Sequence, residues 1–303
     1  MKTLLSSEQG VNAMKTTVFS TIFAAFLCLL CSFHSMAATV YTPEASGTVT
    51  YGNNKAVIDA SHASEGYLMI KYTGSNPTIR LRIAKDTTYT YILNSSGQYE
   101  TFPLTEGSGT YSVKVFELVS GTQYMQVASE SVPVTLSSDT KPFLYPNQFC
   151  NFNANSAVVS QADAITSGIS EPLDKVAAIY NYTVDNITYD NEKAKTVQSD
   201  YLPNPDTTLS QKSGICFDYA SLMTSMLRSQ NIPTKLVIGY ADDVYHAWVS
   251  IYIQSQGWID NVIYFDGTSW KFMDPTFVSS GKKSQEALDY VSNPAHYTAK
   301  FTY

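Results

Sequence analysis

Short runs of apolar residues, separated by turn residues, make up the first half of the chain. Tyr67–Tyr72, Thr78–Ile83 and Tyr111–Phe116 are rich in β-branched and aromatic residues, so each is predicted to be a strand. Val132–Leu136 is expected to be the closing strand, and its proline places it at a sheet edge. About seven short strands at this spacing predict an immunoglobulin-like β-sandwich over residues 38–140.

The pattern changes after the polar segment Ser137–Pro142, which we interpret as a linker. Apolar residues then recur at helical spacing, which predicts helices followed by strands. The helices are expected at about 156–166, 172–184 and 216–229, and the strands at 235–239, 246–253 and 270–273. This order predicts an α+β domain over residues 141–303. The polar linker predicts that the two domains fold independently.

The N-terminal segment has the pattern of a secretory signal peptide. Val18–Cys31 is an apolar run behind Lys15, and small residues follow it at Ser35 and Ala37. The run has about 14 residues, whereas a membrane span needs about 20. We therefore expect residues 1–37 to be removed, leaving a secreted protein without a stable membrane anchor; the alternative is a short anchor.

Composition narrows the function classes. The formal net charge is −7, which argues against nucleic acid as a partner because phosphate binding needs a basic surface. No histidines or cysteines have metal-ligand spacing, and no metal or cofactor is expected. Cleavage after residue 37 would leave two cysteines, Cys150 and Cys216. In an exported protein such a pair would ordinarily suggest a disulfide.

Cys216 stands at the expected start of a helix, behind Ser213-Gly214-Ile215. A thiol there faces unpaired backbone N–H groups and the positive end of the helix dipole, and both stabilise the thiolate. The alternative is a small buried apolar side chain.

His246 and Asp274 are the candidate partners of this thiol. Alternate residues after His246 form an apolar face from Ala247 to Ile253, and His246 belongs to the other face. Asp274 ends a predicted strand, and a neighbouring strand could place it beside His246, where it would orient the imidazole. Asp260 is the alternative acid, and an ordinary Asp-Pro turn is the alternative explanation of Asp274.

Four blocks carry a family resemblance. Tyr182–Asp190 resembles the helix-to-loop approach of the transglutaminase-like superfamily. Its cysteine segment is resembled by Gly214–Ala220 with Leu227–Pro233 and Val237–Tyr240, its histidine segment by His246–Val249 and its aspartate segment by Met273–Thr276, over roughly residues 150–280. One departure is the 28 positions between His246 and Asp274, where such domains commonly have a short hairpin.

The resemblance implies a papain-like fold and a Cys216–His246–Asp274 triad. The thiolate would attack an amide carbonyl, and water or an amine would resolve the acyl-thioester. The backbone N–H of Cys216 would hold the oxyanion. A second donor is usual, and Gln211 and Lys212, which lie close in the sequence, are both candidates for it.

Trp248 and Tyr189 are candidates for an acyl-donor groove. The expected substrate is an extracellular or cell-wall polypeptide, with transglutaminase, deamidase or protease outcomes left open. The alternative is a catalytically silent scaffold for binding or adhesion.

Overall fold

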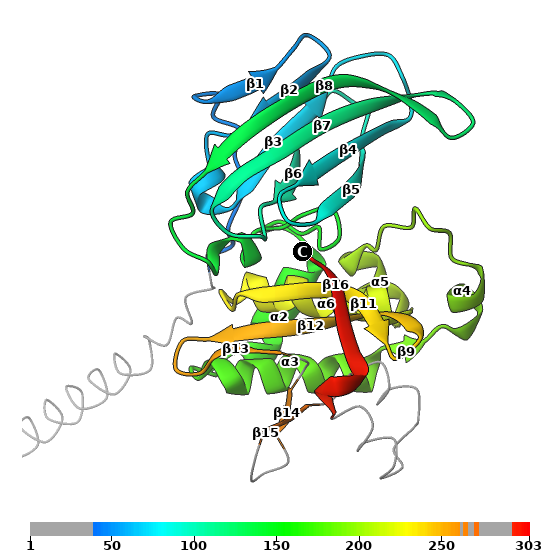
Figure 1. The fold of residues 1–303 in the computed structure, drawn as a ribbon. Coiled ribbons are helices and arrows are strands. Elements are labelled where there is room, and N and C mark those ends of the chain that lie inside the picture. The colour runs from blue at the N-terminus through cyan, green and yellow to red at the C-terminus, as the bar shows by residue number, and fades with distance from the viewer. Residues whose placement is uncertain (1–38, 261–262, 266–269, 273–292) are drawn as a thin grey trace, which may run out of the picture. The chain divides into compact units, whose positions relative to one another are not determined.

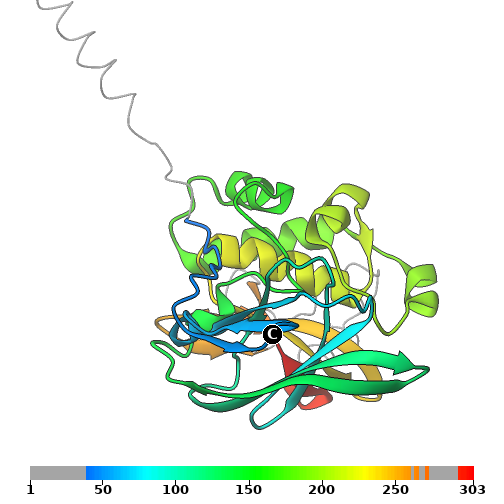
Figure 2. The same ribbon diagram turned by 90° about the horizontal axis from the view of Figure 1, so that it is seen from above.

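Two four-stranded antiparallel sheets form the β-rich region of the chain (Figures 1 and 2). The coordinates are a computed structural model that describes residues 39–260, 263–265, 270–272 and 293–303. The first sheet has the order β1-β2-β3-β6, with β1 (Thr50–Gly52), β2 (Ala56–Asp59), β3 (Tyr67–Tyr72) and β6 (Glu100–Pro103). The second has the order β5-β4-β7-β8, with β4 (Ile79–Ala84), β5 (Thr88–Leu93), β7 (Gly109–Ser120) and β8 (Gln123–Val134).

Alternation of buried and exposed residues builds these sheets, as the sequence predicts. In β7, Tyr111, Val113 and Val115 are buried, and they join the same apolar cluster as Ile58 and Leu68 of the other sheet. The predicted strand 67–72 matches β3, whereas β7 and β8 form a hairpin of two 12-residue strands, longer than expected. Two register shifts between them allow this long ribbon to bend.

Helices and a third four-stranded antiparallel sheet form the α+β region, which confirms the predicted mixture of elements. The helices are α2 (Ala157–Thr166), α3 (Pro172–Asn186), α4 (Asn191–Thr196), α5 (Pro205–Gln211) and α6 (Cys216–Ser229). The sheet has the order β13-β12-β11-β16, with β11 (Thr234–Ala241), β12 (Val244–Ile253), β13 (Gly257–Ile259) and β16 (Tyr297–Thr302). Two small sheets pair β9 (Thr188–Tyr189) with β10 (Ser213–Gly214), and β14 (Ile263–Phe265) with β15 (Trp270–Phe272).

Helix α6 lies at the centre of this region, against the sheet and three other helices (Figure 1). Its apolar residues Tyr219, Leu222, Met223, Met226 and Leu227 are all buried, as their helical spacing predicts. The helix therefore holds its first residue in a fixed place relative to the strands that pack on it. Within the described residues, no helix combines the length and the apolar character that crossing a membrane requires.

The two regions share an aromatic contact. Tyr303 packs on Tyr89 and Tyr91 of β5, with ring centroids 5.4 and 5.9 Å away, and on Phe149 at 4.2 Å. The backbone of Thr302 also accepts a hydrogen bond from Thr105 at 2.9 Å. Residues Ala38–Tyr303 accordingly form one compact unit. The domain boundary near residue 140 stays a prediction.

The segment predicted to be a linker is packed where it ends. Pro142 is buried in a short 3-10 helix, Lys141–Phe143. A Cβ at Gly66 would lie 2.3 Å from the Pro142 ring, and Gly66 has a φ of +94°. Position 66 therefore needs a glycine for two reasons: Pro142 leaves no room for a Cβ, and the backbone of residue 66 is in the left-handed region.

Candidate active site

Cys216 is the first residue of α6, and its thiol is half-buried and free. The preceding residue, Ile215, has an extended backbone and ends the chain's approach to the helix. Backbone N–H groups of the first helical turn have no partner within a helix, so near the thiol they are available to bind the oxygen of a group that the thiol attacks. The predicted helix start is thus confirmed.

Asp218 caps the N-terminus of this helix with its side chain. Its carboxylate accepts a hydrogen bond from the backbone N–H of Ile215 at 2.9 Å, which is one half of a capping box. A Cβ at Gly214 would lie 2.5 Å from the Cβ of Asp218, so only glycine fits there. The residue that approaches Gly214 so closely is therefore the third residue of the helix itself.

Two further residues bind the same carboxylate. Lys193 of α4 donates to Asp218 Oδ2 at 2.7 Å, and Tyr201 donates to the other oxygen. Burial lowers the pKa of Lys193, but its hydrogen bonds to Asp218 and Tyr201 outweigh this and leave the pKa raised. The ion pair fixes the segment 193–201 to the helix that carries Cys216.

His246 comes from β12, directly opposite Gly239 of β11. Its side chain is 6% exposed, and its ring lies 6.3 Å from Trp248 and 6.4 Å from Tyr297 between centroids. A Cβ at Gly239 would lie 2.0 Å from the backbone oxygen of Thr298 in β16. Glycine at this position therefore lets β16 pack closely beside the histidine strand.

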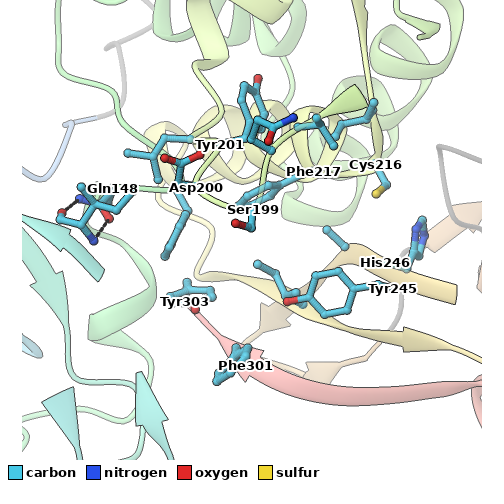
Figure 3. Close-up of a pocket in the computed structure, with 18 of the residues that line it drawn as sticks. Gln148, Ser199, Asp200, Tyr201, Cys216, Phe217, Tyr245, His246, Phe301 and Tyr303 are labelled. Carbon is cyan, nitrogen blue, oxygen red and sulfur yellow. Dashed lines mark hydrogen bonds between the residues drawn. The ribbon is translucent and has the colours of Figure 1, made fainter. Parts of the chain in front are cut away.

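Cys216 and His246 line one cavity of about 990 Å³ (Figure 3). Figure 3 shows the Cys216 sulfur directed toward the side of the cavity where the His246 ring lies. Aromatic side chains make up much of the remaining wall: Tyr91, Phe149, Tyr189, Tyr201, Phe217, Tyr245, Phe301 and Tyr303. A thiol, an imidazole and an apolar cavity are the parts that nucleophilic attack by cysteine needs.

The other candidates from the sequence have different positions. Tyr189 lines the cavity, whereas Trp248 is buried against His246 and does not. Gln211 and Lys212 are exposed, and neither is among the residues that line the cavity. Lys212 ends α5 with a left-handed backbone, φ 53°.

Asp274 and the predicted signal peptide, residues 1–37, lie outside the described residues. Among the described residues, the strand that precedes Asp274, β15, pairs with β14. The long segment between His246 and β15 contains β13 and β14. The placement of Asp274 beside His246 stays a prediction.

Asp260 is poorly placed to orient His246. Ile259, its neighbour, pairs with Ile251, which is five residues or about 17 Å along β12 from His246. Asp260 is exposed and attracts Lys235, whose pKa is lowered by burial although the charge of Asp260 opposes this. A direct hydrogen bond from Asp260 to His246 is thus out of reach.

Cys150 has a structural environment. It is fully buried, accepts a hydrogen bond from Arg228 at 3.1 Å and is free, like Cys216. Burial raises the pKa of the Cys150 thiol, although the charge of Arg228 and hydrogen bonds oppose this. The two cysteines therefore differ in exposure, and only Cys216 faces the cavity.

A thiol at a helix start and a histidine on an antiparallel sheet thus line the same cavity. Residues 159–261 match the family model of the transglutaminase-like superfamily. The chain therefore contains a transglutaminase-like domain. The match ends before Asp274, so it includes the cysteine and histidine segments but not the aspartate segment.

Individual relatives cover only parts of the chain. The uncharacterized protein YebA of Bacillus subtilis is 28% identical over 114 residues, which are 31% of this chain and 16% of YebA. UPF0252 protein MJ1282 of Methanocaldococcus jannaschii is 33% identical over 97 residues, 27% of this chain and 28% of that protein. The chain thus spans less than a third of each relative.

Among solved structures, the periplasmic domain of TgpA from Pseudomonas aeruginosa covers 77% of this chain, and 99% of that domain is covered. The sequences are 16% identical and the TM-score is 0.36.

The sequence analysis missed the Lys193–Asp218–Tyr201 group. For Asp218 the sequence does carry a signal, because an acid three residues after a helix N-cap is the second position of a capping box. Lys193 and Tyr201 carry no such signal, because only the fold brings them to the helix.

Proposed function

We propose that Cys216 is the nucleophile of a thiol acyl-transfer enzyme that acts on amide bonds of polypeptides, with His246 as its acid and base. The observation that carries the proposal is that one cavity holds the thiol at the start of α6 and the imidazole of β12. The match of residues 159–261 to the transglutaminase-like superfamily supports the same chemistry.

The reaction would proceed in two steps. Cys216 Sγ bonds to the amide carbonyl carbon, the C–N bond breaks, and His246 gives a proton to the leaving amine. Water or a second amine then attacks the thioester and releases Cys216, which gives hydrolysis or transfer. The backbone N–H of Cys216, at the helix start, is positioned to stabilise the oxyanion. Asp274 is our proposed orienting acid.

We further propose an exported protein whose β-rich region is an immunoglobulin-like sandwich and whose substrate is an extracellular or cell-wall polypeptide. The two antiparallel four-stranded sheets support the sandwich, and the apolar run before residue 37 supports export. The second candidate function is a binding scaffold without catalysis. The half-buried, cavity-facing thiol disfavours it, because a scaffold does not need a reactive group there.

The test is incubation of the full chain with dimethylcasein, with and without putrescine, followed by intact-mass measurement. Added putrescine mass indicates transfer, a gain of about one dalton indicates deamidation, and shorter fragments indicate proteolysis. Cys216→Ser should lower the rate by on the order of 10⁴-fold or more. Cys150→Ser is the matched control and should keep the rate. Equal turnover by the Cys216→Ser and wild-type proteins would refute the mechanism, and no turnover by the wild-type protein would favour the scaffold.

A further inference from the structure

Strand β5 is an edge of its sheet, because among the residues that the structure describes it pairs with β4 and with no other strand. An edge strand presents backbone N–H and C=O groups without partners, which can pair with another chain. Which residues of β5 point outward therefore decides what the edge can bind.

The hydrogen bonds of Gln148 show which residues of β5 have their backbone groups pointing outward from the sheet. The Gln148 carboxamide accepts a hydrogen bond from the N–H of Ile92 at 3.3 Å, and it donates one to the carbonyl oxygen of the same residue. In an antiparallel strand both groups of one residue point to the same side, so Ile92 faces away from β4. The N–H of Asn94 likewise bonds the side chain of Glu100 at 2.6 Å.

Alternation places Thr90 and Thr88 on the same outward side as Ile92 and Asn94. Both threonines are exposed. In the described part of the chain, neither has a backbone hydrogen bond to any group outside its sheet. The edge is thus covered by side chains at Ile92 and Asn94, and it is open at Thr88 and Thr90.

The open part of the edge faces the thiol's cavity. Thr88, Thr90 and Ile92 line the same cavity as Cys216 and His246. In the view of Figure 3, Gln148 and Cys216 lie on opposite sides of it. The volume of about 990 Å³ is at the upper end of the roughly 300–1,000 Å³ typical of ligand pockets, which leaves room for more than one side chain.

We infer that the outward backbone of Thr88 and Thr90 binds an extended segment of the polypeptide substrate, which adds to the β5 edge as a strand and leads to Cys216. This inference rests on the proposed function and states how its substrate is held. The bound carboxamide of Gln148 supports it, because that group has the N–H and C=O of a peptide bond. Main-chain pairing of this kind recognises extended chains with little dependence on their sequence.

Gln148 has a second role in this arrangement. Because Gln148 bonds the backbone N–H and C=O of Ile92, the open part of the β5 edge ends there and consists of Thr88 and Thr90. A docked strand would therefore begin next to Gln148 and continue past Thr90 and Thr88. We expect an unfolded or extended polypeptide to be preferred over a folded one, because only an extended backbone can pair with the edge.

The experiment measures equilibrium binding of dimethylcasein, an unfolded polypeptide, to the full chain carrying Cys216→Ala, so that no turnover interferes. Thr90→Pro removes the outward N–H, and proline is tolerated at an edge position whose N–H faces outward. Loss of one hydrogen bond should weaken binding by about tenfold. Thr88→Pro should act in the same direction.

Ser131→Pro is the matched control. Ser131 lies on β8, the opposite edge of the same sheet, two residues from the natural Pro133, so its N–H also points outward. It should bind casein like the Cys216→Ala parent. Hydrogen exchange tests the inference without any proline substitution. Bound casein should slow the exchange of the Thr88 and Thr90 amide protons in the Cys216→Ala parent.

Unchanged affinity in both proline variants, no casein binding to the parent, or unchanged exchange at both threonines would overturn the inference. So would a change in oligomeric state with Thr90→Pro, because the edge would then pair with a second copy of the chain. Casein binding at this edge without turnover by the wild-type protein would instead refute only the proposed chemistry.

Discussion

The β-rich region and helix α6 bury polar groups to very different extents. In residues 39–136, all of which are described, two polar side chains are buried, Asp59 and Glu117. The single helix α6 buries six: Asp218, Ser221, Thr224, Ser225, Arg228 and Ser229. Three of the six, Asp218, Ser221 and Arg228, bond to groups outside the helix, so α6 depends on specific tertiary contacts where the sheets depend on alternation.

Arg228 makes the difference concrete. Its guanidinium donates to the carbonyl oxygens of Tyr145, Thr234 and Tyr303, which come from three separate segments. In the β-rich region the comparable group is Glu117 of β7, which binds Tyr72 of β3 in the other sheet and Lys55 from the loop before β2. A helix built in this way can hold a reactive thiol in one place, because its position is determined from several directions.

The largest expected effect is the loss of the β-rich region. A chain that begins at Leu144 lacks Tyr89 and Tyr91, so the rings of Tyr303 and Phe149 lose their cover. Although the sequence predicts independent folding, exposing two such side chains should lower the free energy of unfolding by about 3–6 kcal/mol. Urea unfolding of both chains measures this. An unchanged midpoint would show that the α+β region is self-sufficient.

Arg228→Met should lower the free energy of unfolding by about 3–5 kcal/mol, because three buried carbonyl groups lose their donor. The matched control is Arg82→Met on β4, where the side chain is exposed and stacks on Phe116. It should change stability by less than about 0.5 kcal/mol. Similar losses in the two variants would contradict the contrast between the regions.

Asp274→Asn should reduce the acylation rate by on the order of 10 to 10³-fold with an intact fold, because it favours the wrong tautomer of His246. A thiolate–imidazolium pair depends less on a third group than a serine triad does. Asp260→Asn, at the far end of the histidine strand, should do much less. Rates on dimethylcasein, with circular dichroism as a folding control, decide between them, and the reverse ranking would refute both Asp274 as the orienting acid and the placement of Asp260 away from His246.

The smallest effect concerns pH. The hydrogen bond from Tyr72 and the ion pair with Lys55 hold the pKa of Glu117 below its ordinary value of 4.5, against the effect of burial. Its contribution to stability is therefore present above pH 4.5 and is lost as pH falls below it. Glu117→Gln should destabilise the protein by about 1 kcal/mol at pH 6. Near pH 3 the difference from wild type should shrink, and an equal difference at both pH values would disprove the assignment.

Local periodicity was sufficient for much of this protein. Strand 67–72 and helix 216–229 match their predicted bounds, because alternation and helical spacing are properties of consecutive residues. The same holds for Cys216 as the first residue of its helix. That Cys216 and His246 lie near each other was predicted from the family resemblance rather than from their spacing. Both residues line one cavity.

Contacts between distant segments were decided by the tertiary structure alone. Gln148 covers Ile92 across 56 positions, Arg228 reaches Tyr303 across 75, and Lys193 reaches Asp218 across 25. None of these pairs has a local pattern, since each forms only after the sheets and helices have packed. The β5 edge beside the thiol is of the same kind: alternation predicts a strand, and only packing determines which of its sides faces the cavity.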